Sequence, residues 1–332
     1  FFASLRRSSM LTTPCIARHS RMTPIIMSEL ILHHYDFSNF AEKARLMLGF
    51  KGLAWRGVEI PPIAPKPKLA PLTGGYRRTP VLQDGADVWC DTNLIARELE
   101  RRVPLPTFYP RATAGADEAL TRWAEQQFMR PTALYVSGIN ADHMPAGLHE
   151  DRARLHGLPT PSIEAVRKAA IRNLHLVRPQ IQWLADMLAD GRPYLLGTVP
   201  CIADFAAYHV VWFYRGRHID CRAVFDPYPR LLAWRDRMAV IGHGRRTDID
   251  ADTALAEARA AEPAPPRPSL PQEGDPKPGA PARVRPADNA KDWVEGKVLF
   301  IDAHEIALLR HDPEVGDVAV HFPRLGYDWR ST

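Results

Sequence analysis

The sequence predicts a chain of three parts: an α/β domain, an all-helical domain and a small β-rich C-terminal extension. Apolar residues first follow strand-like and helix-like spacing in turn, then recur only every three or four positions, and finally return in short alternating runs. A proline-rich stretch separates the last two patterns. The predicted parts are residues 29–105 for the α/β domain, 115–250 for the helical domain, 262–285 for the proline-rich linker and 286–332 for the β-rich module.

The composition is that of a globular protein. A chain of 332 residues is long enough for two domains with real cores. Although the net charge is +5, arginine is interleaved with acidic residues along the whole chain, so we expect no nucleic-acid partner. No run of 18 apolar residues occurs, so we expect no membrane span. The cysteines form no C-x-x-C pair and have no histidine at metal spacing, which favours a reducing compartment and no metal.

The first 28 residues have a composition of their own. They are rich in arginine, serine and threonine and contain no acidic residue before Glu29, as organellar transit peptides do. The alternative is that Met27 is the true start and that the reading frame extends too far upstream. We therefore expect residues 1–28 to be disordered, and the protein to be cytoplasmic, or mitochondrial if the segment is a real transit peptide.

Within the α/β domain the elements follow one another in the order strand, helix, strand, loop, hairpin and helix. The proline- and lysine-rich loop cannot be regular structure. The Asp84-Gly85 pair is a hairpin turn. Elements in this order predict a mixed sheet with helices on both faces. The expected strands are Leu30–Leu32, Trp55–Ile60, Thr79–Leu82 and Ala86–Trp89; the expected helices begin after Ser38 and at Thr92, the latter ending at Arg101.

The helical domain is read from its apolar spacing. We expect the first helix, Glu118–Met129, to stop before Pro131. A long helix between Thr160 and Gly191 should kink at Pro179. Two further helices are expected, Ala203–Tyr214, which is apolar on nearly every side and hence buried, and Pro229–Val240.

The most informative stretch is Tyr35–Arg45, in which the first strand turns through Ser38 into a helix. Free N–H groups and the positive end of the helix dipole favour an anion at such a position. Arg77–Leu82 and Asp91–Thr92 follow at the next two element junctions. In this order the motifs resemble the glutathione transferase family, of the serine or cysteine type with an omega-, zeta- or tau-like N-terminal domain. With Asp204 and the run Pro229–Trp234, the resemblance extends over residues 29–250.

The resemblance implies a thioredoxin-like domain that binds glutathione and a helical C-terminal domain. It assigns to Ser38 the hydrogen bond that stabilises the glutathione thiolate. Lowering a thiol pKa by about two units takes roughly 2.7 kcal/mol. A hydroxyl bond to a charged group gives about 1.5–3 kcal/mol and a helix N-terminus about 0.3–2 kcal/mol, so no metal is needed. The alternative is that Ser38 only caps its helix.

Further glutathione contacts are implied by the same resemblance. Thr79 and cis-Pro80 would present backbone atoms to the cysteinyl part, and Arg78 would lie near the glycyl carboxylate. Asp91 and Thr92 would bind the γ-glutamyl end, with Asp91 paired to its ammonium. The alternatives are a strand-entry proline, a solvated surface arginine and an ordinary helix cap.

The acceptor pocket would lie between the two domains. Four side chains at helical spacing could line it, although aromatic residues at such spacing are more often core. They are Trp123, Gln127, Phe128 and Tyr135.

The function that we expect is conjugation of the glutathione thiolate to a small electrophile, as in detoxification, by a homodimer with glutathione as co-substrate. The alternatives are a non-catalytic binding or scaffold protein and a glutathione-dependent isomerase, dehalogenase or ether-cleaving enzyme. Because the linker suggests independent folding, truncation after Ala261 is expected to leave a soluble, glutathione-binding protein. The extension should form a small meander from Gly296–Asp302, Glu305–Arg310, Asp317–Phe322 and Gly326–Trp329, packed on the main body or on a partner.

Overall fold

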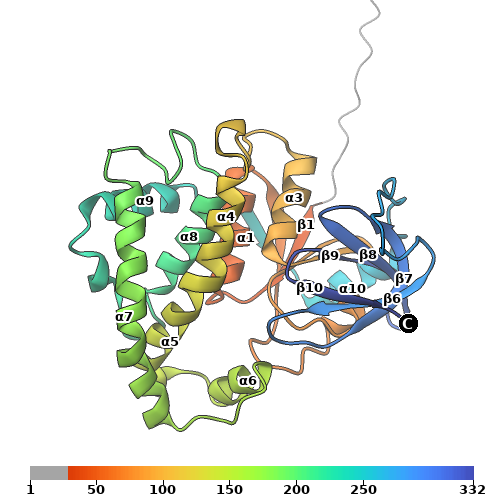
Figure 1. Ribbon diagram of the computed structural model, residues 1–332. Coiled ribbons are helices and arrows are strands. Elements are labelled where there is room, and N and C mark those ends of the chain that lie inside the picture. Colours follow the sequence, from red (N-terminus) through yellow and green to blue (C-terminus); the bar gives the residue numbers. More distant parts are fainter. Residues whose placement is uncertain (1–28) are drawn as a thin grey trace, which may run out of the picture.

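A computed structural model describes residues 29–332 of the chain (Figure 1). The predictions for residues 1–28 lie outside the described residues. Helices gather on one side of the molecule, and a long sheet runs through the other side. The predicted fold class, a thioredoxin-like domain, a helical domain and a β-rich extension, is confirmed.

The thioredoxin-like domain has the predicted order of elements. Strand β1 pairs in parallel with β2 and antiparallel with β3, which forms the predicted hairpin with β4. The elements are β1 (Leu30–His34), α1 (Asn39–Phe50), β2 (Ala54–Glu59), α2 (Ala70–Thr73), β3 (Val81–Asp84), β4 (Asp87–Cys90) and α3 (Thr92–Arg102).

Strand alternation divides the buried side chains between two cores. Leu30, Leu32 and Trp89 face α1, α3 and the helical domain, whereas Ile31 and Val88 face the other side. That second side is covered by α2 and by α10 (Ala251–Ala260), a helix that the sequence analysis did not predict. Period-two patterning therefore produces a sheet with helices on both faces, as expected.

The helical domain contains the predicted long and buried helices, but its first helix is longer than predicted. Its elements are α4 (Ala116–Arg122), a π-helical segment (Trp123–Phe128), α5 (Met129–Ile139), α6 (Leu148–Leu155), α7 (Ile163–Met187), α8 (Ile202–Phe213) and α9 (Pro229–Val240), with short 3-10 turns at Arg111–Thr113, Ala141–His143 and Arg222–Phe225.

The prediction that Pro131 ends the first helix was wrong. The chain passes from α4 through the π-helical segment into α5, and Pro131 lies in the first turn of α5. A proline there leaves the carbonyl of Gln127 without its usual backbone donor. The side chain of Gln180 in α7 donates to that oxygen at 3.3 Å instead. The widened turn and this replacement donor let the helix continue.

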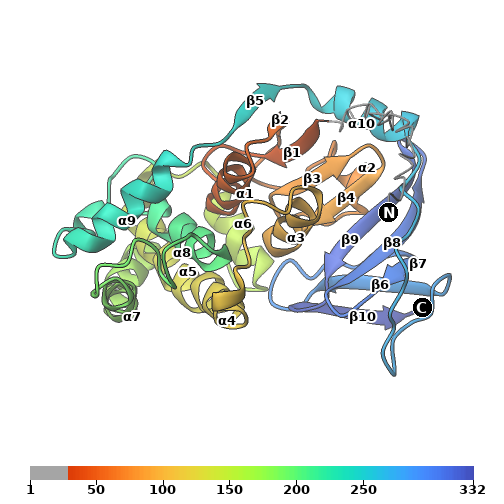
Figure 2. The same ribbon diagram turned by 90° about the horizontal axis from the view of Figure 1, so that it is seen from above.

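The extension continues the central sheet. Its strands are β6 (Pro281–Pro286), β7 (Val294–Ile301), β8 (Glu305–Asp312), β9 (Gly316–Pro323) and β10 (Tyr327–Ser331). Strand β9 pairs in parallel with β4, and β5 (Arg245–Asp248) pairs in parallel with β2 at the opposite edge. The result is one ten-stranded sheet, in the order β10-β6-β7-β8-β9-β4-β3-β1-β2-β5. Figure 2 shows the strands of the extension beside those of the thioredoxin-like domain.

Two expectations about the extension change. Strand β6 lies largely inside the range 262–285 that was predicted as linker, because its two prolines, Pro281 and Pro286, occupy the strand ends, where they are tolerated. The preceding proline-rich segment is held against the sheet. The Ala264 amide donates to Asp87 at 2.8 Å and the Leu270 amide to the Ile301 carbonyl at 2.8 Å. One sheet and one shared core argue against independent folding of the extension.

Candidate functional site

Strand register brings the predicted site segments to one end of the sheet. His33 in β1 lies opposite Val81 in β3, and Val81 lies opposite Cys90 in β4. The loop after β1, the residues before β3 and the residues after β4 are therefore neighbours. These three segments contain Ser38, Thr79–Pro80 and Asp91–Thr92.

Ser38 is the N-cap of α1. Its backbone is extended (φ −73°, ψ 120°), and its Oγ accepts from the Ala41 amide at 3.1 Å. A serine hydroxyl has one proton to donate and two lone pairs. Because capping uses only a lone pair, the proton of Ser38 can still be donated to an anion at the helix N-terminus. The capping and thiolate-binding roles are thus compatible.

Thr79 and Pro80 are joined by a cis peptide bond, the form that the resemblance implies. A residue that the sequence analysis missed contacts this pair: the Nζ of Lys66 donates to the Thr79 Oγ1 at 2.6 Å. Lys66 also lies 5.7 Å from the ring centroid of Tyr35, in the loop that leads to Ser38. Lys66 therefore places a cationic group between two of the three site segments.

Positive charge accumulates around Lys66. Arg77 and Arg152 both bond to Asp151, a buried carboxylate in α6, and Arg152 also donates to the Tyr35 hydroxyl at 3.2 Å. Burial lowers the pKa of Lys66 to about 7, and the charges of Arg152 and Arg77 act in the same direction. One carboxylate cannot balance two arginines and the charged form of Lys66, so the cluster favours a bound anion such as a carboxylate, which would also favour the charged form of Lys66.

Asp91 and Thr92 open α3 as predicted. Asp91 has φ 80°, a conformation that is rare for residues other than glycine and costs free energy, and such residues cluster at functional sites. Its Oδ1 accepts from the Asn93 amide at 2.9 Å. The Thr92 Oγ1 receives a bond of 3.3 Å from the Nζ of Lys43 in α1.

Lys43 belongs to a buried charged network beneath these segments. Its Nζ lies 2.6 Å from Oε1 of Glu125, a residue of the π-helical segment. Asn93 donates to the other Glu125 oxygen at 2.7 Å. Burial opposes ionisation of Glu125, but the charge of Lys43 and the nearby His209, whose Nε2 lies 3.8 Å from Oε1, hold its pKa well below the usual range. An ionised Glu125 therefore ties the N-terminal turns of α1 and α3 to the helical domain.

Arg78 is directed toward the extension. Its guanidinium bonds to the Asp288 carboxylate and to the Asn289 carbonyl, both in the loop between β6 and β7. The cationic side chain that bonds to Thr79 is Lys66, whereas the sequence analysis assigned the glycyl carboxylate to Arg78.

The four residues predicted for the acceptor pocket differ in their surroundings: the three aromatic residues pack against other rings, and the glutamine is exposed. Phe128 is fully buried, and Trp123 stacks on it at 5.5 Å and lies 6.0 Å from Trp183 of α7, all between ring centroids. Tyr135 packs against Tyr214, the residue after α8, at 6.1 Å, and Gln127 is exposed. The aromatic rings thus contribute to the packing of the helical domain. In the same region Glu125 and Met129 contact α1, through Lys43 and Asn39 respectively.

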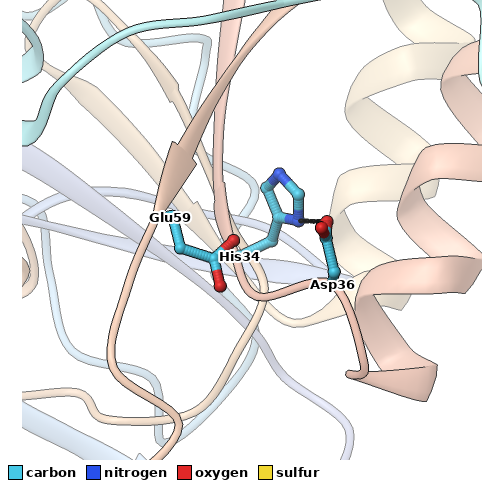
Figure 3. Close-up of side chains that lie close together, drawn as sticks. All are labelled: His34, Asp36 and Glu59. Carbon is cyan, nitrogen blue, oxygen red and sulfur yellow. Dashed lines mark ion pairs between the residues drawn. The ribbon is translucent and has the colours of Figure 1, made fainter.

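A cluster of possible metal ligands lies where β1 and β2 end (Figure 3). His34 Nδ1 is 3.9 Å from Asp36 Oδ1, and Glu59 lies beside them. Two arginines already occupy these atoms: Arg45 donates to His34 Nδ1 at 3.1 Å, and Arg246 donates to Asp36 at 2.9 Å. Burial, with the charges of both arginines, lowers the pKa of His34 to about 3. We assign no metal to this cluster.

Sequence reasoning missed Lys66, Lys43 and Glu125 for different reasons. Lys66 lies in the loop that was predicted to be irregular and was therefore not considered for the site. A lysine in the loop before the Thr79–Pro80 pair could nevertheless have indicated a cationic group near that pair. Lys43 and Glu125 are ionisable residues in helices that pack on one another, and their pairing depends on a long-range contact.

Comparison with known proteins identifies both domains of the chain. Residues 32–107 match the family model described as glutathione S-transferase, N-terminal domain, and residues 167–237 match glutathione S-transferase, C-terminal domain. No curated protein matches at a significant level. None of the helices in residues 29–332 combines the length and apolarity needed to cross a bilayer.

A solved structure of a GST-like protein from Pseudomonas syringae is 38% identical, with a TM-score of 0.73. The match covers 92% of this chain and all of the other, a share that residues 1–250 cannot fill, so the likeness reaches into the extension. A glutathione transferase from Phanerochaete chrysosporium (18% identity, TM-score 0.49, 65% of this chain and 98% of the other) and a beta-etherase from Sphingobium (17%, 0.47, 63% and 94%) are too distant to add to the argument. The chain belongs to the glutathione transferase family.

Proposed function

We propose that the protein binds glutathione and transfers its thiolate to a small electrophilic acceptor. The observation that carries this proposal is the convergence of Ser38, the cis Thr79–Pro80 pair and Asp91–Thr92 at one end of the sheet. Ser38 would donate its free proton to the thiolate. Asp91 would accept the γ-glutamyl ammonium, and Lys66 would bind the glycyl carboxylate. As the family usually pairs its subunits, we expect these sites in a homodimer.

The charge pattern supports glutathione as the ligand. Glutathione carries one ammonium and two carboxylates, and the site offers one half-buried carboxylate and a cationic cluster around Lys66. The helix N-terminus at Ser38 follows β1, which neighbours β3 and the Thr79–Pro80 pair in the sheet. A thiolate there would be the third anionic group, favoured by the α1 dipole.

Substitution of Ser38 by alanine tests the proposal. Turnover at pH 7 should fall about 100-fold, because one hydrogen bond to a charged sulfur is lost. Glutathione affinity should change far less, since other groups hold the rest of the tripeptide. Turnover is measured with an activated aryl halide, an epoxide and an α,β-unsaturated carbonyl, and affinity by calorimetry.

The matched control is Ser162→Ala. Ser162 caps α7 in the same way, accepting from the Ala165 amide at 3.2 Å, and lies in the helical domain. Both variants should lose similar stability, about 1 kcal/mol, but only Ser38→Ala should lose turnover. Equal turnover of folded Ser38→Ala and wild type would contradict the proposal. Binding of glutathione without turnover of any electrophile would support the binding-protein alternative.

A further inference from the structure

The extension reaches one residue of the proposed glutathione site, Asp91, and one residue that adjoins it, Arg78. The β6–β7 loop bonds to Arg78 through Asp288 and Asn289, and Tyr327 at the start of β10 donates its hydroxyl proton to Asp91 Oδ2 at 3.3 Å. Arg78 precedes the cis Thr79–Pro80 pair, and Asp91 opens α3. The side chains that contact Arg78 and Asp91 here therefore come from residues more than 190 positions further along the chain.

The backbone conformation before β10 positions Tyr327 beside Asp91. Gly326 has φ 88°, a conformation that disfavours other residues, and its carbonyl accepts from the Ala287 amide at 3.0 Å. Strand β10 then pairs with β6, with Tyr327 opposite Pro286. The Tyr327 ring lies 6.0 Å from that of Phe322 in β9, between centroids. The position of Tyr327 is thus fixed by the sheet of the extension itself.

The hydroxyl of Tyr327 is the middle member of a series of three hydrogen-bonded groups. It lies 2.9 Å from the hydroxyl of Tyr76 as well as 3.3 Å from Asp91. An ionised carboxylate only accepts, so Tyr327 donates to Asp91 and accepts from Tyr76. Burial raises the pKa of both tyrosines well above the usual range, so both keep their protons.

Asp91 consequently has a donor on each oxygen: the Asn93 amide on Oδ1 and Tyr327 on Oδ2. Two donors on different oxygens fix the plane of the carboxylate and leave lone pairs on both oxygens for a third partner. Burial and the nearby Glu125 raise the pKa of Asp91, and hydrogen bonds from donors such as the Asn93 amide act in the opposite direction. A carboxylate fixed in this way is suited to bind an ammonium group, whose charge would favour its ionised form.

We propose that Tyr327 is a positioning residue of the glutathione site, which holds Asp91 in the orientation that receives the γ-glutamyl ammonium. The inference rests on the proposed function only in that Asp91 binds glutathione; it does not need turnover. It makes the C-terminal extension a part of the ligand site. The β6–β7 loop also contacts the helical domain, since the Ala290 amide donates to the Leu155 carbonyl of α6 at 3.1 Å.

The test compares two ligands on Tyr327→Phe. One is glutathione, and the other is its analogue with hydrogen in place of the γ-glutamyl amino group, glutaryl-cysteinyl-glycine. Removal of one hydrogen bond to a charged group should weaken glutathione binding about tenfold. The analogue has no ammonium, so its affinity should change by no more than about twofold. Both dissociation constants are measured by titration calorimetry on the full chain.

Three further variants complete the test. Tyr76→Phe removes only the second link and should weaken glutathione binding by a smaller factor. Tyr194→Phe, in the helical domain, is the control and should change neither ligand. Asp91→Asn should weaken glutathione binding, and adding Tyr327→Phe to it should have no more than about a twofold further effect, because the hydroxyl acts through the carboxylate.

The outcomes separate the two proposals. If wild type binds glutathione and Tyr327→Phe binds it equally well, the role of Tyr327 is overturned while the proposed function stands. Equal losses for glutathione and the analogue would also overturn it, because they would indicate a general structural defect. If wild type does not bind glutathione at all, the proposed function falls and this inference falls with it. The selective loss of glutathione affinity supports the positioning role.

Discussion

The two edges of the thioredoxin-like sheet are extended in different ways. At the β2 edge the chain adds β5, a strand of four residues that is largely exposed. At the β4 edge it adds β9, an eight-residue strand whose last six residues are buried. Both additions are parallel and both come from beyond the helical domain. Only the second carries further strands, β6, β7, β8 and β10, whose buried residues share one core with the thioredoxin-like domain.

The polar groups at the two junctions differ as much as the strands do. At the β5 junction Arg246 pairs with Asp36 at 2.9 Å and with Asp248 at 2.6 Å, and both carboxylates are mostly exposed. At the β9 junction His321 is buried between Glu305 at 2.6 Å and Asp87 at 3.1 Å, and its ring stacks on that of Trp89. Burial lowers the pKa of His321, but the bonds to Asp87 and Glu305 outweigh it and raise it to about 9.

This difference indicates how an added strand becomes part of a domain. The exposed ion pairs of β5 are screened by water and contribute little. The charged histidine of β9 is paired on both sides within a buried layer, where loss of one partner is costly. We therefore expect the β9 edge to be essential for the stability of the fold and the β5 edge to contribute little to it.

The largest expected effect is that of truncation after Ala261. It would expose the open edge of β4 and remove buried residues such as Phe322, which packs against Tyr76. We expect most of the protein to become insoluble or to lose cooperative unfolding, as measured by soluble yield and thermal denaturation. Deletion of residues 327–332 alone removes only an edge strand and should leave soluble protein. A soluble truncated chain that still binds glutathione would show the extension to be independent.

A smaller effect is expected from the charge on His321. Its folded-state pKa of about 9 lies above the unfolded value of 6.5, so its stabilisation is complete below pH 6.5 and is lost as the pH rises through 9. The free energy of unfolding should fall by up to about 3 kcal/mol across this window. His321→Gln should flatten that dependence, measured by urea denaturation at several pH values.

The control for this measurement is His311→Gln. His311 lies in the neighbouring β8 and pairs with Asp317 at 2.7 Å, but its side chain is largely exposed. It should leave the pH dependence as it is in wild type. If His321→Gln and wild type showed the same dependence, the buried charge would not be what secures the β9 edge.

The smallest effect is expected at the β5 edge. Arg246→Ala removes two surface ion pairs and should lower the free energy of unfolding by no more than about 1 kcal/mol. Chemical denaturation at low and high salt measures this loss and its screening. A loss larger than that of His321→Gln at pH 6 would reverse the proposed ranking of the two edges.

Local patterns in the sequence were sufficient for most elements. The alternation in β1 and the three-and-four spacing of α7 are properties of neighbouring residues, and so is the cap at Ser38. The candidate site was predictable to the same extent. Ser38, Thr79–Pro80 and Asp91–Thr92 each stand at a junction between adjacent elements, where a turn or a helix start is encoded locally.

The remaining features depend on contacts between distant parts of the chain. The pairing of β9 with β4 joins residues more than 230 positions apart, and spacing within either strand does not specify its partner. For the same reason the sequence alone could not place Tyr327 against Asp91 or Glu125 against Lys43. The passage of the helix through Pro131 likewise required Gln180 from another helix to bond the freed carbonyl. Sequence by itself determined most of the elements and which junctions carry polar groups. The tertiary structure decided which side chains meet, because register and burial are set by packing across the whole molecule.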